Sequence, residues 1–282
     1  MIYPEAYDKV VPPTMFNEVE PNDTIESAME LPLCVADINA CFKYDFSGEI
    51  NVNGKISKGD IDYYKTFLSD YRENYVYLIS RGNSLEVQIL NENGDVVEEF
   101  TSNPFGDYIC KKIDNLSGNC YIRLSGADKD SEYSLMVGQI IENGYASMKI
   151  DGVLTLTRNQ PFSETKFFID KSKFFDVILG KKLPDELTVV SIDINMISSE
   201  RNGREPYDLE TYYSYEGVSN WQKTPYMKYC IDIPPSKSIG FGSLMRLKMQ
   251  CDEYNIRRDF SLKPTFRIRY LFYVNEENID CY

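Results

Sequence analysis

Residues 85–97 read LEVQILNENGDVV, and this stretch decides the fold class. Its first half alternates apolar and polar side chains, which is the period of a half-buried β-strand. Asn93 and Gly94 then supply the positive-φ positions that a tight hairpin turn needs, and Val96 and Val97 begin a second strand. The stretch therefore predicts a β-hairpin with one face against a core.

The same alternation recurs on both sides of this hairpin. Residues 75–79, 121–124 and 133–137 alternate in the same way, turn residues separate them, and helical periodicity is scarce. After Gly138 the pattern restarts, with strands expected at 146–156, 174–179, 187–197, 226–233, 243–249 and 265–274. Short strands punctuated by turns are typical of β-sandwiches, so we expect an all-β protein.

The chain has 282 residues, which at about 150 residues per domain predicts two domains. We expect an extended arm over residues 1–15, a first β-sandwich over 16–138 and a second β-sandwich in tandem over 139–282. Charge follows this division, since residues 1–138 hold 11 basic and 24 acidic side chains and residues 139–282 hold 19 and 20. Residues 246–269 are locally basic, which predicts either a solvated strand face or a surface complementary to the acidic first domain.

The sequence contains no histidine, which excludes most hydrolase mechanisms. Ser-His-Asp and Cys-His nucleophiles, a histidine general base and His-ligated zinc are all ruled out. Residues 240–243, GFGS, lack the G-x-S-x-G order of a nucleophile elbow, and no phosphate-binding G-x-x-x-x-G-K-[ST] occurs. Two-carboxylate glycosidase chemistry stays open only because acids are numerous. The sequence therefore predicts a protein without catalytic activity.

The net charge of −14 argues against nucleic acid or an anionic membrane as a partner. No run approaches the roughly 18 uncharged apolar residues of a transmembrane helix, so membrane insertion is not expected. Residues 1–15 contain charges and three prolines but lack the apolar core of a signal peptide. We expect either synthesis without Sec export or a start after a leader that has been removed.

Seven cysteines are present, without CxxC pairs or the spacing of a zinc site. Cys110 and Cys120 flank the turn-like segment KKIDNLSGN, so they are candidates for a disulfide across two paired strands. Cys34 and Cys41 are similarly close in sequence. The alternative is reduced, partly buried thiols. In an oxidising compartment one thiol must be left over, and Cys281 is the candidate for an intermolecular link.

Two short acidic clusters carry the chemistry of a calcium site. Oxygen-bearing side chains crowd residues 18–23, EVEPND, and two further carboxylates alternate on one strand face in residues 59–62, GDID. The candidate ligands are Glu18, Glu20, Asn22, Asp23, Asp60 and Asp62. Ca²⁺ takes about six to eight oxygen ligands, and a bound cation relieves the repulsion between such acids. The alternative is that Asp23 or Thr24 caps a short helix near residues 24–29 and the other acids are solvated.

Four ordered elements of the first domain match a known pattern. EVEPNDT at 18–24 is similar to E-x-E-P-N-D-T, and GKISKGDIDYY at 54–64 is similar to G-x-[IL]-x-x-G-D-x-D-[WY]-[YF]. LEVQILNENG at 85–94 matches a strand and turn, and GNCYIRL at 118–124 with YSLMV at 133–137 matches the closing strands. On these elements, residues 16–138 resemble the bacterial pre-peptidase C-terminal domain, a β-sandwich related to the collagen-binding domains of clostridial collagenases. Residues 33–50 depart from the pattern and look like an insertion.

The resemblance implies that the six oxygen-bearing residues named above bind calcium and stiffen the join between a linker and the sandwich. It also places the domain among modules that are appended to secreted bacterial peptidases. The resemblance covers a little under half of the chain, and the second domain carries no such resemblance.

An aromatic-rich stretch is the most distinctive feature of the second domain. The candidate ligand-binding residues are Tyr207, Tyr212, Tyr213, Tyr215, Trp221 and Tyr226. Aromatic faces in a loop hold sugars or grip extended peptides. The alternative is that these rings pack the sandwich or a subunit contact.

These features predict a non-catalytic, calcium-stabilised binding or adhesion protein of a bacterial cell or spore surface. Its partner is expected to be a glycan or a fibrous protein. The alternative is a structural subunit of a surface assembly, of spore-coat or appendage type, that self-associates through the N-terminal arm, the cysteines and the 22 tyrosines.

Overall fold

The structure is a computed structural model that describes residues 14–34, 50–68, 70, 73–177, 183–215, 220–224, 230–233, 239–277 and 279. These residues form β-strands joined by turns, with short 3₁₀ turns at Lys171–Lys173 and Glu253–Asn255. The prediction of an all-β protein is confirmed. Within the described part of the chain, no helix is long and apolar enough to cross a membrane.

Contacts divide the chain into two compact units. The first comprises the residues up to Glu142 together with Tyr273–Asp280, and the second comprises Asn143–Phe272. The C-terminal segment is fastened to the first unit, since the Val274 N–H donates to the carbonyl of Ile140 (3.0 Å). The boundary between the two units therefore lies after Glu142 and not at residue 139, and residues 273–277 return to the first unit.

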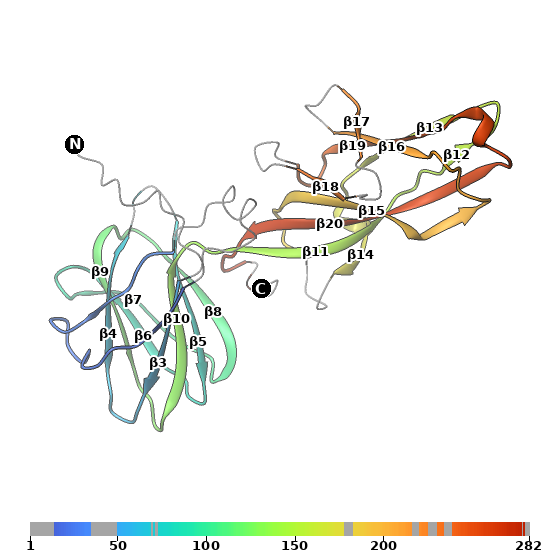
Figure 1. The fold of residues 1–282 in the computed structure, drawn as a ribbon. Coiled ribbons are helices and arrows are strands. Elements are labelled where there is room, and N and C mark those ends of the chain that lie inside the picture. The colour runs from blue at the N-terminus through green and yellow to red at the C-terminus, as the bar shows by residue number, and fades with distance from the viewer. Residues whose placement is uncertain are drawn as a thin grey trace. The chain divides into compact units, whose positions relative to one another are not determined.

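The first unit is a sandwich of two five-stranded sheets (Figure 1). One sheet has the order β1 (Thr14–Asn17), β3 (Ile50–Ile56), β10 (Ser131–Gly138), β5 (Asn74–Arg81), β8 (Phe105–Ile113). The other has the order β2 (Met29–Glu30), β4 (Asp62–Leu68), β9 (Gly118–Ser125), β6 (Glu86–Leu90), β7 (Val96–Thr101). Residues 1–13 of the expected arm lie outside the described residues, and its last two residues belong to β1, which pairs in parallel with β3.

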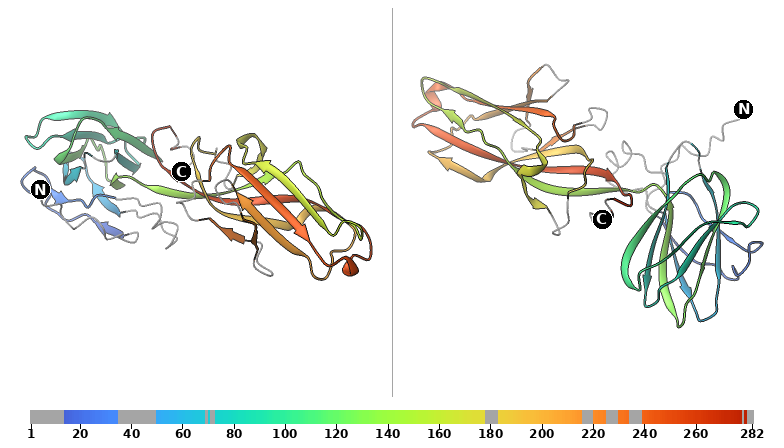
Figure 2. Two further views of the ribbon diagram at one scale, coloured as in Figure 1. Left: turned by 90° about the horizontal axis from the view of Figure 1, so that it is seen from above. Right: turned by 180° about the vertical axis from the view of Figure 1, so that it is seen from behind.

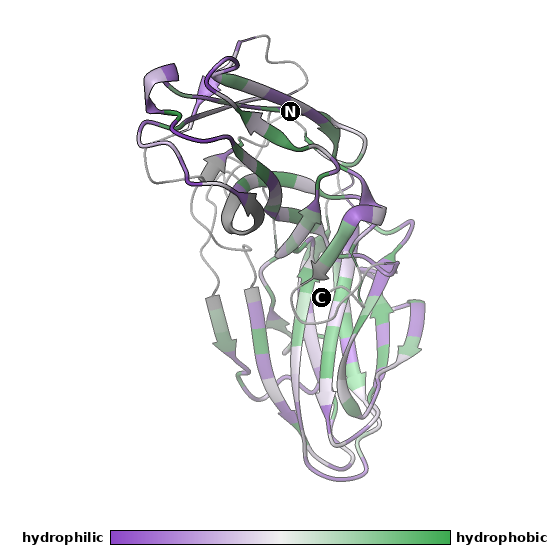
Figure 3. Ribbon diagram, turned by 90° about the vertical axis from the view of Figure 1, so that its right-hand side faces the viewer, coloured by the Kyte–Doolittle hydropathy of each residue, from purple (hydrophilic) through white to green (hydrophobic). Residues whose placement is uncertain are grey.

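Side chains from the two facing sheets fill the core of the first unit. Alternate residues of each strand point inward, which gives the alternating bands of hydropathy in Figure 3. The fully buried side chains include Tyr64, Leu78, Leu85, Ile89 and Ile122. A large aliphatic side chain buried in this way contributes about 1.5–3 kcal/mol, and a one-residue slip of register would expose it. The core therefore fixes the register of the strands that carry the site described below.

The hairpin predicted from residues 85–97 is present, formed by β6 and β7. Gly94 has a φ of +83°, in the left-handed region that favours glycine. The Oδ1 atom of Asn91 accepts the N–H groups of Asn93 (2.9 Å) and Asp95 (3.0 Å), which closes the turn. The short helix expected near residues 24–29 is instead a single hydrogen-bonded turn, followed by β2.

The second unit is also built from two sheets (Figure 2). One has the order β14 (Phe174–Val177), β11 (Ile141–Lys149), β20 (Phe260–Tyr273), β15 (Thr188–Asn202), β18 (Cys230–Asp232), with β12 (Leu154–Leu156) paired to β20. The other has the order β13 (Phe162–Phe168), β19 (Leu244–Gln250), β16 (Glu210–Tyr215), β17 (Gln222–Lys223). The sequence did not predict β13 and β16, which form the second sheet around β19.

Candidate functional site

The segment that follows β1 brings the predicted acids to the first unit's two sheets. The Glu18 N–H donates to the carbonyl of Asn53 in β3 (2.9 Å), and the Tyr63 N–H in β4 donates to the carbonyl of Asn22 (2.8 Å). The segment is therefore tied by its backbone to a strand of each sheet. Asp62 is the first residue of β4, so the same hydrogen bonds place it beside the segment.

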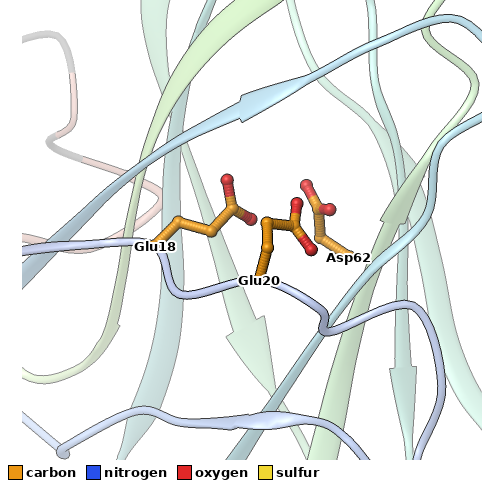
Figure 4. A group of neighbouring side chains, drawn as sticks. All are labelled: Glu18, Glu20 and Asp62. Carbon is orange, nitrogen blue, oxygen red and sulfur yellow. The ribbon is translucent and has the colours of Figure 1, made fainter.

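The five predicted carboxylates gather into two groups that share one member. Carboxylate oxygens of Glu18, Glu20 and Asp62 lie within 4.8 Å of one another, and Figure 4 shows the three side chains directed toward a common point. Oxygens of Glu20, Asp23 and Asp60 meet the same limit. The structure thus brings together all five acids of the expected calcium site, although residues 18–23 and 60–62 are far apart in the sequence.

Two tyrosines lie against these acids. The Tyr133 hydroxyl lies 2.6 Å from Oε1 of Glu18 and 2.7 Å from Oδ2 of Asp62. The Tyr64 hydroxyl lies 2.9 Å from the same oxygen of Glu18 and 2.5 Å from the Tyr133 hydroxyl. Two hydroxyls carry only two protons, so they cannot neutralise this group of carboxylates.

Sequence reasoning missed both tyrosines as part of the site. Tyr133 stands directly opposite Gly54 in the β10–β3 ladder, and a Cβ added to Gly54 would lie 2.3 Å from Cζ of the ring. A glycine inside a strand marks a place where another group approaches closely. That glycine, in the motif GKISKGDIDYY, was the available signal.

Two buried oxygen atoms of the site have no hydrogen-bond partner among the described residues. They are Oδ1 of Asn22 and Oδ1 of Asp62, and both residues are fully buried. The rest of Asn22 is engaged, since its Nδ2 donates to Glu18 Oε1 (3.0 Å). Buried acceptors without partners are uncommon in native structures and each costs about 1–3 kcal/mol, so they call for an explanation.

The charge on Asp62 is likewise uncompensated. Burial, and after it the neighbouring carboxylates of Glu18, Asp60 and Glu20, raise the pKa of Asp62 to about 8, while the Tyr133 hydroxyl opposes the shift. Burial also raises the pKa of Glu20 above its ordinary value. A hard cation fits this set, because the donors are all oxygens and the unpartnered atoms are acceptors. The residues present therefore fit calcium, with Asn22 and Asp62 as its most buried ligands.

The alternative prediction, that Asp23 or Thr24 caps a short helix, holds only in that Thr24 closes a turn. The Ser27 N–H donates to Oγ1 of Thr24 (3.3 Å) and to its carbonyl (3.2 Å), so Thr24 closes a turn. Asp23 lies instead with the acids of the second group. The turn and the acidic site are therefore separate features of residues 18–27.

Two of the predicted aromatic residues of the second unit flank one lysine. The Lys248 Nζ lies 4.3 Å from the ring centroid of Tyr212 and 5.3 Å from that of Trp221. The Tyr212 hydroxyl donates to Glu210 Oε2 (2.7 Å), and Gln250 Nε2 donates to the same oxygen (3.0 Å). We call Tyr212, Trp221 and Lys248 the aromatic patch. It combines ring faces with hydrogen-bonding groups on one sheet.

The other predicted aromatic residues do not join this patch. Tyr213 and Tyr215 stack with ring centroids 6.3 Å apart, and Tyr215 is buried, so the prediction of Tyr215 as a ligand contact is wrong. They alternate with Tyr212 along β16 and so take the opposite face. Tyr207 is 95% exposed, and Tyr226 lies outside the described residues.

The candidate disulfide between Cys110 and Cys120 is not formed, and both are buried free thiols, as the alternative prediction had them. Cys110 is on β8, which pairs with β5, whereas Cys120 is on β9, which pairs with β4 and β6 in the other sheet. Burial raises the pKa of each thiol to about 12, so both stay protonated at neutral pH. The two cysteines are close in sequence but do not face each other on paired strands, because the turn between them carries the chain from one sheet to the other.

No protein-family model matches the chain, and no curated protein matches it. Among solved structures, the chain is similar to one described as "a putative secreted protein from Eubacterium rectale". The TM-score is 0.50 at 11% identity, over 88% of this chain and 80% of that chain. A chain of the Sulfolobus turreted icosahedral virus aligns with a TM-score of 0.21 at 9% identity, over 80% of this chain and 60% of that one. The first similarity shows the fold alone, and at that coverage it extends over both units.

Proposed function

We propose that this chain is a non-catalytic, calcium-stabilised binding or adhesion protein of a bacterial surface. The observation that carries the proposal is the pair of buried, unpartnered oxygens on Asn22 and Asp62, beside carboxylates that repel one another. Calcium supplies the missing positive charge and can be coordinated by all of these oxygen atoms. The resemblance to the pre-peptidase C-terminal domain supports the same ion at the same residues.

Calcium at this site would join the segment after β1 to the sandwich. Glu18, Glu20 and Asn22 come from the segment, and Asp62 comes from β4, so an ion held by both fixes one against the other. The second group, with Asp23 and Asp60, supplies further oxygens from the same two parts of the chain. The role we propose for the metal is therefore structural.

The aromatic patch is the proposed contact for a polymer. Its rings and the neighbouring Glu210 and Gln250 offer both apolar faces and hydrogen bonds, as sites for glycans and extended peptides do. A surface or extracellular location is supported by the similarity to a protein described as secreted.

Calorimetric titration with calcium tests the metal. Because the pKa of Asp62 is raised to about 8, calcium binding at pH 7 is expected to release a proton, which makes the heat depend on the ionisation enthalpy of the buffer. The Asp62→Asn variant should bind more weakly and release no proton. Binding without proton release, or binding unchanged in the variant, would count against the site.

Fluorescence of Trp221, the only tryptophan, tests the polymer contact. Soluble polysaccharides and a collagen-like triple-helical peptide are the probes. Tyr212→Ala should weaken binding, whereas Tyr254→Ala, which removes another exposed ring of the same unit, should not. Equal effects of the two substitutions would remove the patch from the proposal.

Self-association is the second candidate function, and the edge strand β1 favours it. Among the described residues β1 ends its sheet, and its Met15 and Phe16 are 72% and 38% exposed. An open edge with apolar side chains is a surface on which another strand can pair. A mass that rises with concentration and falls on deletion of residues 1–15 would support assembly, and a monomer at all concentrations would exclude it.

A further inference from the structure

A groove of about 770 Å³, lined by both polar and apolar side chains, lies on the first sheet of the first unit, mainly on the face turned away from the core. Its floor is formed by β3, β10 and β5, and β1 and β8 border it. The polar side chains that line it include Asn17, Asn51, Asn53, Arg81, Tyr108 and Ser134. The volume is in the range of small-ligand sites, about 300–1,000 Å³.

The strand register aligns several of these side chains into one row. Directly paired residues lie on the same face of a sheet. The ladders pair Asn17 with Asn53, Asn53 with Ser134, Ser134 with Ile79, and Ile79 with Tyr108. The row therefore crosses five strands and offers two amides, one hydroxyl, one apolar side chain and one aromatic ring.

Hydrogen-bonding capacity in the groove is unused. The side chains of Asn17, Asn53, Arg81 and Ser134 make no hydrogen bond or ion pair with the described residues. The Oδ1 atom of Asn51, two residues before Asn53 on the same face of β3, is buried and also has no partner among the described residues. Polar groups that converge in a concave site without partners inside the protein are placed to bind a ligand.

The backbone of the groove floor is already paired. β3, β10 and β5 each have a neighbour on both sides, so their N–H and C=O groups are used in the ladders. A peptide that binds by strand addition needs a free edge, which this floor lacks. A ligand in this groove must therefore bind through side-chain amides, hydroxyls, a guanidinium and an aromatic ring. These groups match a ligand that carries several hydroxyl groups on rings with apolar faces.

We infer that this groove is a binding site for an oligosaccharide. Tyr108 packs against a sugar ring, while Asn53, Ser134 and Arg81 hydrogen-bond its hydroxyls. The site is in the first unit, so it is distinct from the aromatic patch, and it does not rest on the function proposed for that patch. Glu18 and Glu20 border the groove, so calcium bound there would fix one end of it.

A printed array of plant, fungal, bacterial and animal oligosaccharides, probed with the full chain in calcium, tests the inference. We expect binding to at least one structure. For that oligosaccharide, Tyr108→Ala and the double substitution Asn53→Ala with Ser134→Ala should each lower the affinity about tenfold or more. The matched control is Asn119→Ala, an exposed asparagine on β9 of the opposite sheet, which should leave the affinity unchanged.

The outcomes separate this site from the aromatic patch. Loss of binding in the groove variants with retention in Tyr212→Ala supports the groove. Loss only in Tyr212→Ala overturns it and supports the patch instead. Absence of binding to every oligosaccharide also overturns it, and leaves the calcium site untouched. Melting curves of the groove variants, expected to match the parent, show that each substitution acts on binding and not on folding.

Discussion

The two units are both two-layer β-sandwiches, yet they bury different polar groups. Among the described residues, the buried polar side chains of the second unit are hydroxyls: Ser163, Ser191, Thr211, Ser214 and Thr224. The first unit buries amides as well, and it buries the carboxylate of Asp62. A hydroxyl is satisfied by one nearby backbone group, whereas a buried carboxylate needs a countercharge. The first unit therefore contains a fully buried carboxylate, whereas the buried polar side chains described in the second unit are neutral hydroxyls.

A shared packing device sharpens the contrast. In each unit a tyrosine ring covers a glycine on the neighbouring strand: a Cβ on Gly54 would lie 2.3 Å from Cζ of Tyr133, and one on Gly144 would lie 2.4 Å from Cζ of Tyr270. In the first unit the hydroxyl at the end of that ring reaches the carboxylates of Glu18 and Asp62. The two units thus share the packing of a tyrosine ring over a glycine, and in the first unit this packing also places the tyrosine hydroxyl in the acidic site.

The largest expected effect is that of Asp62→Asn measured in calcium. At a calcium concentration a hundredfold above Kd, the parent gains about 2.7 kcal/mol from the ion, and the variant should lose most of it. In chelator at neutral pH the substitution should cost little, because the pKa of Asp62 is raised to about 8 and its carboxyl is already mostly protonated, so a neutral group of similar size replaces a neutral group. Glu20→Gln should behave in the same way. Urea denaturation in both conditions makes the measurement, and equal losses in calcium and in chelator would reduce these residues to ordinary packing or capping.

The next largest loss of stability is expected for Gly54→Ala. The new methyl group forces the buried Tyr133 ring to move, at a cost of about 1–3 kcal/mol, and carries its hydroxyl away from the acids. Gly144→Ala should cost a similar amount in the second unit. Only the Gly54 variant should also respond less to calcium in the same denaturation experiment. An equal calcium response in both variants would separate the Tyr133 hydroxyl from the metal site.

Without calcium, stability should fall as pH rises from 6 to 7. The pKa of Asp62 is raised to about 8 in the folded protein, so the folded state holds a proton that the unfolded state has already released. That contribution is complete below the unfolded pKa and is lost as pH rises through the folded value, with a slope of up to about 1.4 kcal/mol per pH unit. Asp62→Asn should flatten this slope. A slope that persists in the variant would have to come from another group.

The smallest expected effect is in the aromatic patch. Lys248→Gln removes a cation from the faces of Tyr212 and Trp221 and should cost about 0.5–1 kcal/mol, equally in calcium and in chelator. It should also change the emission of Trp221. Lys166→Gln, an exposed lysine on β13 of the same sheet, is the matched control and should change neither. A calcium-dependent effect of Lys248→Gln would show that the metal acts on the second unit.

Local patterns in the sequence predicted strands in both units and missed some in each, among them β3 and β8 in the first unit and β13 and β16 in the second. Strands such as residues 85–90 alternate cleanly, because one face meets a core of aliphatic side chains. In β13 the inward positions include Ser163 and Thr165 while Phe162 and Phe168 are 57% exposed, so hydropathy does not alternate. In β16 tyrosines occupy both faces. These two strands could not be predicted by periodicity, so of their sheet only β19 was predicted.

The candidate calcium site also contains residues that the sequence predicted and residues that it did not. The oxygen-bearing residues were visible because each cluster is contiguous, and a motif preserves its own spacing. The tyrosines could not be assigned, because Tyr133 and Tyr64 reach the acids only through ladder register and sheet packing. The unpartnered atoms of Asn22 and Asp62 are properties of burial, which no local pattern encodes. The candidate disulfide between Cys110 and Cys120 is not formed because residues that are close in sequence can lie in different sheets.

Thermal melting of the full chain in millimolar calcium and in chelator, followed by two probes, tests the central claim most directly. Trp221, the only tryptophan, reports the second unit, and far-ultraviolet circular dichroism reports both. Calcium should raise the midpoint of the transition seen by circular dichroism and leave the Trp221 transition nearly unchanged. No shift in either probe, or a shift confined to Trp221, would contradict the assignment of a calcium ion to the first unit.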